Sequence, residues 1–324
     1  MGKQSVLGEL RAFRATIPQE KLRVWENPTG WPCLLKIARD WALILAAYQL
    51  FARFPSSPTF IAALLLMSWG QRGLSTLAHD SIHGNLYKNK WINDLVTNVF
   101  LAPALMSTAK LQRASHSAHH NYLGTEDDPD HGEHNPTSLR HYRTGTYCHK
   151  SMFSLFLYDV MDPVLFLHSA LGDLKAAPVL LIGWWAAVGL LTSFLEPSYP
   201  LLSLGNIRIN TFVVLFHFVR CTISYGFYVL REIIDHSGLP SNGVLEFTRS
   251  SPWGSWFQKF LQPHDDNYHL LHHLLPKVPM SKLHVADSWL MKNNEEYAKA
   301  NHFDTYLEDH KSLFLQQLHS CANE

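Results

Sequence analysis

Long apolar runs separated by polar stretches are the most visible pattern in this sequence. The run from Ala176 to Leu195 contains twenty residues and no charge. As a helix it would span roughly 30 Å, the thickness of the hydrocarbon core of a bilayer. The run from Ile209 to Leu230 has the same character, with Arg220 as its single charged residue. Both runs predict membrane-spanning helices.

A third apolar stretch, from Trp41 to Gln71, predicts a helical hairpin. It is interrupted by Arg53 and by the segment FPSSP, whose prolines break a helix. We expect one helix over about residues 35–54 and a second over about residues 58–78. Two shorter or more charged runs, at residues 95–109 and 151–168, suit helices that lie in the membrane interface.

Basic residues are distributed unevenly around these runs. The connections at residues 54–58 and 196–208 carry almost none, apart from Arg208. The segment before the first helix carries many: Lys3, Arg11, Arg14, Lys21, Arg23, Lys36 and Arg39. By the positive-inside rule, the N-terminus, residues 79–174 and the tail after Ile234 face the cytosol.

These patterns predict an all-α integral membrane protein with four transmembrane helices in two hairpins and a cytosolic, histidine-rich helical cap. We divide the chain into a cytosolic N-terminal segment (1–34), a membrane domain with its cap (35–290) and a cytosolic helical tail (291–324). The alternative is a large soluble helical domain, because two of the runs contain an arginine, which is costly in a bilayer. We expect a multi-pass protein of a bacterial inner membrane rather than of the endoplasmic reticulum.

The amino-acid composition excludes several classes of protein and points to a role for histidine. The 27 basic and 27 acidic residues cancel, so the chain offers no net attraction for nucleic acid. With 47% hydrophobic and 17% charged residues, it is not intrinsically disordered. The four cysteines are scattered, which predicts neither a disulfide framework nor a cysteine metal cluster. A role for histidine is indicated by the presence of 20 histidines.

Eight of these histidines form three groups at helical spacing. Residues at i, i+3 and i+4 share one face of a helix, so each group presents its imidazoles together. With 20 histidines in 324 positions, two H-x-x-H-H triplets are improbable by chance. The groups are His79 and His83; His116, His119 and His120; and His269, His272 and His273.

All eight can converge at one membrane face, where they exceed the ligands that a single ion can use. Two metal ions are therefore expected. Imidazole binds zinc, copper, iron and nickel alike, so the ligand type alone does not identify the metal. The remaining histidines, among them His131, are expected to be ordinary surface or core residues.

The segments HDSIHG, HSAHHNYLGTEDDPD and NYHLLHHLLPKVP resemble the three histidine boxes of the membrane fatty acid desaturase superfamily. The resemblance covers about residues 60–290 and implies a non-haem di-iron centre at the cytosolic face of four transmembrane helices. It also implies a further ligand from a single histidine after the last helix, which corresponds to His236. The implied metal ligands and catalytic residues are His79, His83, His116, His119, His120, His236, His269, His272 and His273.

Two departures from relatives within that superfamily narrow the expectations. The first box is H-x-x-x-H, unlike the box of the acyl-CoA stearoyl desaturases, so an acyl-CoA substrate is not implied. No cytochrome b5 haem segment and no cysteine cluster for iron and sulfur is present in the sequence. Electrons are therefore expected from a separate protein of the ferredoxin or cytochrome b5 type, together with its reductase.

Five polar residues near the boxes are candidates for orienting the imidazoles by accepting a ring N–H. The alternative for the acidic run at residues 127–130 is a simple turn or helix cap. The candidates are Asp80, Asp128, Asp130, Glu232 and Asn267.

The expected reaction is O2-dependent abstraction of hydrogen from an unactivated C–H bond of a fatty acyl chain, with desaturation as the first choice. Hydroxylation of a lipid chain and oxidative decarboxylation of a free fatty acid to a terminal alkene remain open. A di-zinc membrane hydrolase is a rival enzyme class, although the usual H-E-x-x-H motif is absent. A haem or metal transporter is a rival outside the enzymes, but its histidines should lie within the spans.

Overall fold

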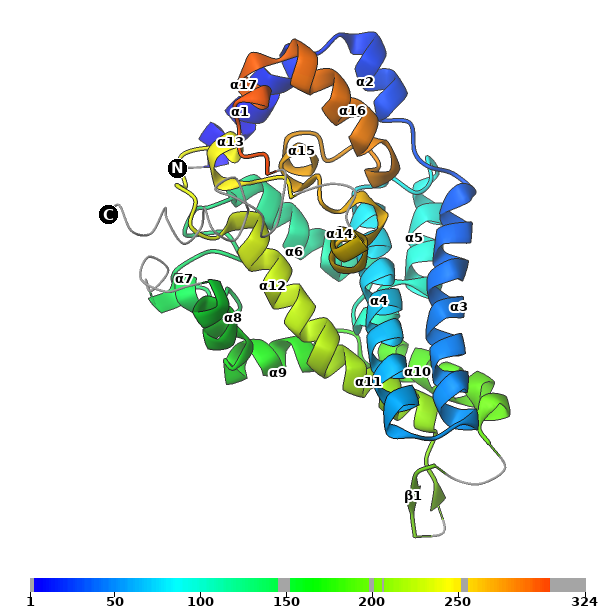
Figure 1. The fold of residues 1–324 in the computed structure, drawn as a ribbon. Helices are drawn as coiled ribbons and strands as arrows, with labels where there is room; N and C mark the ends of the chain where they lie inside the picture. The colour runs from blue at the N-terminus through cyan, green and yellow to red at the C-terminus, as the bar shows by residue number, and fades with distance from the viewer. Residues whose placement is uncertain (1–2, 145–151, 198–200, 206, 252–255, 304–324) are drawn as a thin grey trace.

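The structure is a computed structural model that describes residues 3–144, 152–197, 201–205, 207–251 and 256–303. The described part is built almost entirely of helices (Figure 1). Its strands are a two-residue pair, β1 (Ser203–Leu204) and β2 (Ile207–Arg208), which are antiparallel. In Figure 1 this pair lies at one end of the molecule, and the helices of the C-terminal region lie at the other.

The predicted first hairpin is present as α3 (Pro32–Arg53) and α4 (Ser57–Ile82). Helix α4 begins at a capping box, in which the Ser56 side chain accepts from the backbone N–H of Thr59. It ends at the first histidine box, where His83 is the C-cap and Gly84 follows with φ of +79°. The hairpin therefore delivers the first box to one end of the helix pair.

Helices α3 and α4 approach each other closely at Gly73. A Cβ at that position would lie 2.3 Å from Oδ2 of Asp40 on α3. The Asp40 carboxylate is held by Arg39 and by His264, whose Nε2 is 2.8 Å away. Only glycine allows α4 to pack this closely against the buried carboxylate.

The two other long apolar runs form α10 (Pro178–Thr192), extended by the 3₁₀ turn η2 (Ser193–Leu195), and a second helix that is longer than expected. That helix comprises α11 (Thr211–Val219), a π-helical turn η3 (Arg220–Ser224) and α12 (Tyr225–His236). It continues six residues beyond the apolar run, and so His236 occupies its last turn. Single π turns inside α-helices are frequent at functional sites.

By length and composition, two helices in the described residues are able to cross a membrane: Pro178–Leu195 and Thr211–His236. The pair Phe153–Val160 and Pro163–Leu171 makes a third if it counts as one span, although it bends by 63°. Helices α3 and α4 do not meet the same standard, because charged and polar residues dilute their apolar surface. Two to three spans are thus supported, and the four-span topology stays a prediction.

The two shorter runs are broken rather than continuous. The run at 95–109 contains the end of α5 (Lys90–Phe100), the 3₁₀ turn η1 (Ala102–Leu105) and the start of α6 (Ala109–Tyr122). Pro103 lacks the N–H that a continuous α-helix would need there. The run at 151–168 divides into α8 (Met152–Val160) and α9 (Pro163–Leu171), and residue 151 lies outside the described residues.

The remaining helices form a cap around the second and third boxes (Figure 1). Val6 and Phe13 of the N-terminal segment pack in one hydrophobic cluster with Leu270, Leu271 and Leu283. The N-terminal segment is thereby joined to the cap, and residues 304–324 of the predicted tail lie outside the described residues. The helices of the cap are α1 (Lys3–Ala15), α2 (Gln19–Trp25), α7 (Arg140–Thr144), α13 (Val244–Phe247), α14 (Trp256–Leu261), η4 (Pro263–Asp265), α15 (His269–Leu274), α16 (Met280–Asn293) and α17 (Glu295–Ala298).

Candidate metal centre

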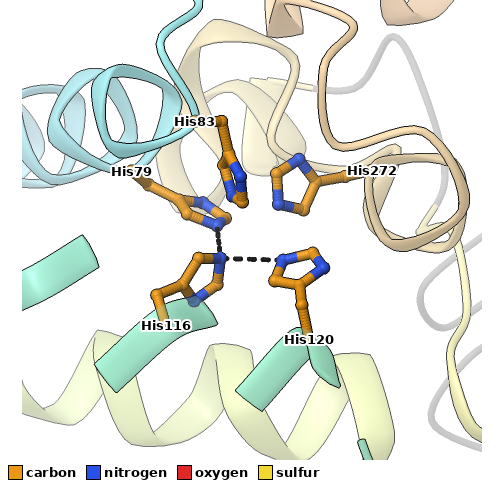
Figure 2. Close-up of side chains that lie close together, drawn as sticks. All are labelled: His79, His83, His116, His120 and His272. Atoms are coloured by element: carbon orange, nitrogen blue, oxygen red, sulfur yellow. Dashed lines mark hydrogen bonds between the residues drawn. The ribbon is translucent and has the colours of Figure 1, made fainter. Parts of the chain in front are cut away.

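Five of the nine predicted histidines surround one point (Figure 2). Each offers a ring nitrogen, and these nitrogens all lie within 4.8 Å of one another. Two come from the end of α4, two from α6 and one from α15. The Nε2 atoms of His79 and His116 are 2.7 Å apart, and those of His116 and His120 are 2.9 Å apart. The group, called site A below, comprises His79, His83, His116, His120 and His272.

The other four histidines form a neighbouring group, called site B. The Nε2 atoms of His236 and His269 are 2.8 Å apart, and those of His269 and His273 are 2.9 Å apart. His119 completes the group, with its Nε2 3.4 Å from that of His273. All four side chains are buried. The predicted ninth ligand, His236, is thus brought to the same place as the boxes.

The histidines of one box belong to two different sites because of their spacing on a helix. On α6, His116 and His120 are one turn apart and face site A, whereas His119 lies between them and faces site B. On α15, His272 belongs to site A, and His269 and His273 belong to site B. Each H-x-x-H-H box therefore contributes to both groups, which brings two donor sets close together.

These donor sets fit metal ions. Among the described residues, ring nitrogens without a hydrogen-bond partner include His83 Nε2, His120 Nδ1 and both nitrogens of His272. A buried polar atom left without a partner is costly, and a bound cation would remove that cost. Five nitrogen donors in site A and four in site B suit two ions of the imidazole-binding transition metals.

Asp128 orients one ligand of site B from the outside. Its Oδ1 lies 3.0 Å from Nδ1 of His119, and its Oδ2 lies 3.0 Å from Nδ1 of His131. Burial opposes protonation of His119, but the charges of Asp128 and Asp130 outweigh it and raise the pKa of His119 to about 9. Nδ1 of His119 donates to the carboxylate, and a metal ion would displace the proton on Nε2, which then becomes the ligand atom.

Asp266 lies beside a ligand of site A. Its Oδ1 is 3.8 Å from Nδ1 of His79, and its Oδ2 is 2.9 Å from Arg72 and 3.0 Å from Arg231. Although burial favours the neutral acid, Arg231, the nearby His79 imidazole and Arg72 together hold the pKa of the Asp266 carboxyl well below its ordinary value. The residue is therefore an anion placed against a metal-site histidine.

Two further contacts orient ligands of site B. His236 Nδ1 donates to the backbone carbonyl of Phe247 at 3.0 Å, which turns its Nε2 toward His269. His269 Nδ1 lies 3.0 Å from Nη2 of Arg231, whereas Oδ2 of Asp235 is 3.6 Å away, beyond hydrogen-bond distance. Asp235 and Asp266 were not among the residues expected to orient the imidazoles. The available signal was their position, one residue before His236 and three before His269.

The five predicted orienting residues have different surroundings. Asp128 contacts an imidazole directly, and Asp130 Oδ2 lies 3.5 Å from Nδ1 of His119. Glu232 groups with His131 and His236 and accepts from Arg231 at 2.7 Å. The hydrogen bonds of the other two lead away from the ring nitrogens: Asp80 accepts from Asn85 and the backbone N–H of Met280, and Asn267 bonds to Gln258 and Ser251.

His131 is a candidate ligand that sequence reasoning missed. It is buried, its Nδ1 is bonded to Asp128, and its Nε2 has no hydrogen-bond partner. Its ring nitrogens lie within 4.8 Å of ligand atoms of both Glu232 and His236. The signal was the spacing Asp128-x-x-His131, which places both side chains on one side of the turn after the second box.

A helical fold with apolar helices able to cross a membrane and a buried polyhistidine centre defines the class of protein. The fatty acid desaturase family model matches residues 55–305. That range includes all three boxes and most of the chain, and the chain belongs to the fatty acid desaturase family.

A curated relative supports this assignment. The chain is similar to the dihydrorhizobitoxine desaturase of Bradyrhizobium elkanii, with 28% identity over 285 residues. The matched region covers 81% of this chain and 76% of the relative. The resemblance inferred from the boxes is thereby confirmed at the level of the family, and it supports an oxidoreductase that is associated with a membrane.

Proposed function

We propose that this protein is a di-iron, O2-dependent membrane oxidase that introduces a double bond into an acyl chain. The observation that carries the proposal is the convergence of nine imidazoles from three boxes and the last turn of α12 into two adjoining groups. Membership of the fatty acid desaturase family supports iron, and the name of the curated relative supports desaturation.

Site A and site B would each hold one iron, through the nitrogens described above. Two bound irons would supply the O2 chemistry, driven by two external electrons, that breaks an unactivated C–H bond. Overall, one O2, two electrons, two protons and two substrate hydrogens give one double bond and two waters. The electrons come from a separate reduced ferredoxin or cytochrome b5 type protein with its reductase.

The chain's own residues provide orientation. Asp128 and the Phe247 carbonyl hold two imidazoles through Nδ1, so that their Nε2 atoms point inward, and Asp266 lies 3.8 Å from Nδ1 of a third. His79, His116, His119 and His269 also line the adjoining cavity, and so a substrate bound there would lie against ligands of both sites. Fixing the acyl carbons there would decide which C–H bonds are attacked.

The test combines metal analysis with product analysis. We expect about two irons per chain, and we expect unsaturated product when the purified protein receives O2, a reduced electron donor and lipid or free-acid substrates. His272→Ala removes a donor of site A, so iron content should fall and activity should drop on the order of 100-fold or more. His284→Ala, on the exposed face of α16, is the matched control.

Other outcomes identify the alternatives. Two zincs with hydrolytic activity would replace the proposal with a di-zinc hydrolase. Iron with hydroxylated product, or with a terminal alkene and carbon dioxide, would keep the di-iron oxidase and change the reaction. Turnover with NADPH and O2 alone would contradict the need for a separate electron-carrying protein.

A further inference from the structure

A cavity of about 420 Å³ adjoins the metal centre and lies between α4, α6, α9, η3 and α12. Its volume falls in the range of small-molecule binding sites. His79, His116, His119 and His269 form part of its wall, so a molecule bound in it would face both sites. The residues that line the cavity therefore indicate the chemical class of the substrate of the proposed oxidase.

Much of the wall of this cavity is apolar, but polar side chains are interspersed in it away from the histidines. Ser75, Thr76, Gln112 and Ser115 line it from α4 and α6, and Ser107 and Ser169 line it from the other side. A tunnel for a plain hydrocarbon chain is expected to be apolar, because CH2 groups cannot replace the hydrogen bonds that hydroxyls and amides lose on leaving water. This cavity suits a substrate with hydrogen-bonding groups of its own.

Two wall residues have polar atoms with no hydrogen-bond partner. Thr76 Oγ1 is one, on a side chain that is 2% exposed, and Gln112 Oε1 is the other. Both residues line the cavity, and a buried polar atom without a partner is unfavourable. A hydroxyl or amine on the substrate would complete these bonds, whereas a methylene would leave them unmade.

A buried guanidinium lies in the wall on the π-helical turn η3. Arg220 is 8% exposed, and its Nη1 and Nη2 donate to the carbonyls of Ser169 and Ala170 at 2.8 and 2.5 Å. Its Nε donates to His217 Nδ1 at 3.3 Å, and Nη2 also lies 3.5 Å from the Cys221 sulfur.

Arg220 has no carboxylate partner within ion-pair distance in the part of the chain that the structure describes. The two other arginines of this wall, Arg72 and Arg231, are both paired with Asp266. Asp173, which also lines the cavity, accepts a hydrogen bond from Ser107. A guanidinium has five N–H donors, and the four contacts above leave Arg220 one terminal N–H, on Nη1, for an anion. A buried charge in an apolar helix is costly, and such residues mark binding sites.

The guanidinium and the metal centre lie at different heights along the helices. Ser224 donates to Gln71 at 2.7 Å, which sets η3 and α4 level at that point. From Gln71, His79 is eight residues further along α4, or about 12 Å at 1.5 Å per residue. Arg220 is four residues before Ser224, about 6 Å in the opposite direction. One molecule in the cavity can thus have its anionic group at one end and its reacting carbons at the other.

We infer that the substrate is a free carboxylic acid whose chain carries additional hydrogen-bonding groups, bound with its carboxylate on Arg220 and its polar groups on Thr76 and Gln112. This inference rests on the proposed function, since it names the substrate class of the same centre. It excludes an acyl group esterified in a phospholipid or held in a thioester, because such a group has no free carboxylate for Arg220.

The experiment measures binding by the shift in unfolding temperature of the purified protein, without turnover. The probes are dodecanoate against methyl dodecanoate, and a mid-chain hydroxydodecanoate against dodecanoate. We expect the free acid to bind at least about 10-fold more tightly than the ester, as a hydrogen bond to a charged group implies. The hydroxylated acid should bind more tightly than the plain acid.

Three variants assign these preferences to residues. Arg220→Gln should abolish the preference for the acid over the ester, and Arg220→Lys should keep part of it because the charge remains. Thr76→Val keeps the volume and removes the hydroxyl, so it should reduce the preference for the hydroxylated acid. Arg53→Gln, at an exposed arginine outside the cavity, is the matched control and should change neither preference.

Equal binding of acid and ester by the unaltered protein, or an undiminished acid preference in Arg220→Gln, would overturn the inference. These results are separate from the test of the proposed function. A protein with two irons that desaturates a phospholipid acyl chain regardless of Arg220 refutes the inference alone. A protein without iron that binds the hydroxylated acid through Arg220 refutes the oxidase and keeps the binding site.

Discussion

At the scale of single residues, Asp128 is central to the site, because its buried carboxylate bonds to two imidazoles. Its two oxygens lie 3.0 Å from His119 and 3.0 Å from His131. It also accepts from the backbone N–H groups of Gly124 and Asp130, both at 2.9 Å. The carboxylate therefore fixes the turn after the second box and, through it, a ligand of site B.

We predict that Asp128→Asn weakens iron binding at site B and lowers activity by about 10- to 100-fold, the usual effect of removing a group that orients a metal ligand. The amide keeps the size of the side chain but accepts from only one imidazole. Iron content against chelator concentration, measured with turnover, checks the prediction. Asp127→Asn, an exposed neighbour of the same type, is the control, and equal losses in both variants would contradict the role of Asp128.

At the scale of elements, the α3–α4 pair fixes the position of the first box. The pair forms the most extensive helix–helix contact in the described residues, and Gly73 lies where the two helices approach closely. His79 is only six residues beyond Gly73 on the same helix. A change in helix separation at Gly73 is therefore transmitted to site A.

We predict that Gly73→Ala destabilises the protein by about 1–3 kcal/mol, the usual cost of overpacking, because the new methyl would collide with the hydrogen-bonded Asp40 carboxylate. Iron content should fall with it, since His79 and His83 move with α4. Thermal unfolding in detergent, together with metal analysis, measures both effects. Gly183→Ala on α10, where an added Cβ meets nothing within 4 Å, should leave both unchanged.

At the scale of the whole molecule, the apolar helices and the histidine-rich cap occupy opposite ends of the structure (Figure 1). The β1–β2 pair lies at the end away from the cap and is exposed. If α10 and α11–α12 cross the bilayer in the predicted orientation, this pair is outside and the cap is in the cytosol. The four-span topology therefore makes opposite predictions for two exposed positions.

We predict that Ser203→Cys on β1 is labelled by an impermeant thiol reagent in intact cells, whereas Lys110→Cys on α6 is labelled only after permeabilisation. Both positions are exposed in the structure, so access rather than burial decides the result. The native cysteines are first replaced by serine. Labelling of both positions from the same side would contradict the topology.

The sequence by itself determined the features that depend on neighbours along the chain. Apolar runs of helical length, one without charge and one with Arg220 as its single charge, identified α10 and α11–α12, and FPSSP marked the turn between α3 and α4. The spacing of the boxes put each set of imidazoles on one helical face, and the resemblance of the boxes identified the family, because both signals are local. The sequence did not reveal the breaks at Pro103 and Pro163, since the apolar character of those runs continues across them.

Only the tertiary structure decided how the nine histidines divide into five and four, because neighbouring residues of one box face different sites. Asp266, Asp235 and His131 likewise gained their roles from contacts between separate segments. From the sequence, Arg220 is a single charge in an apolar run. The structure shows that it contacts α9 and lines the cavity. A one-dimensional pattern records which side chains share a helix face, whereas the partner of that face depends on how distant helices pack.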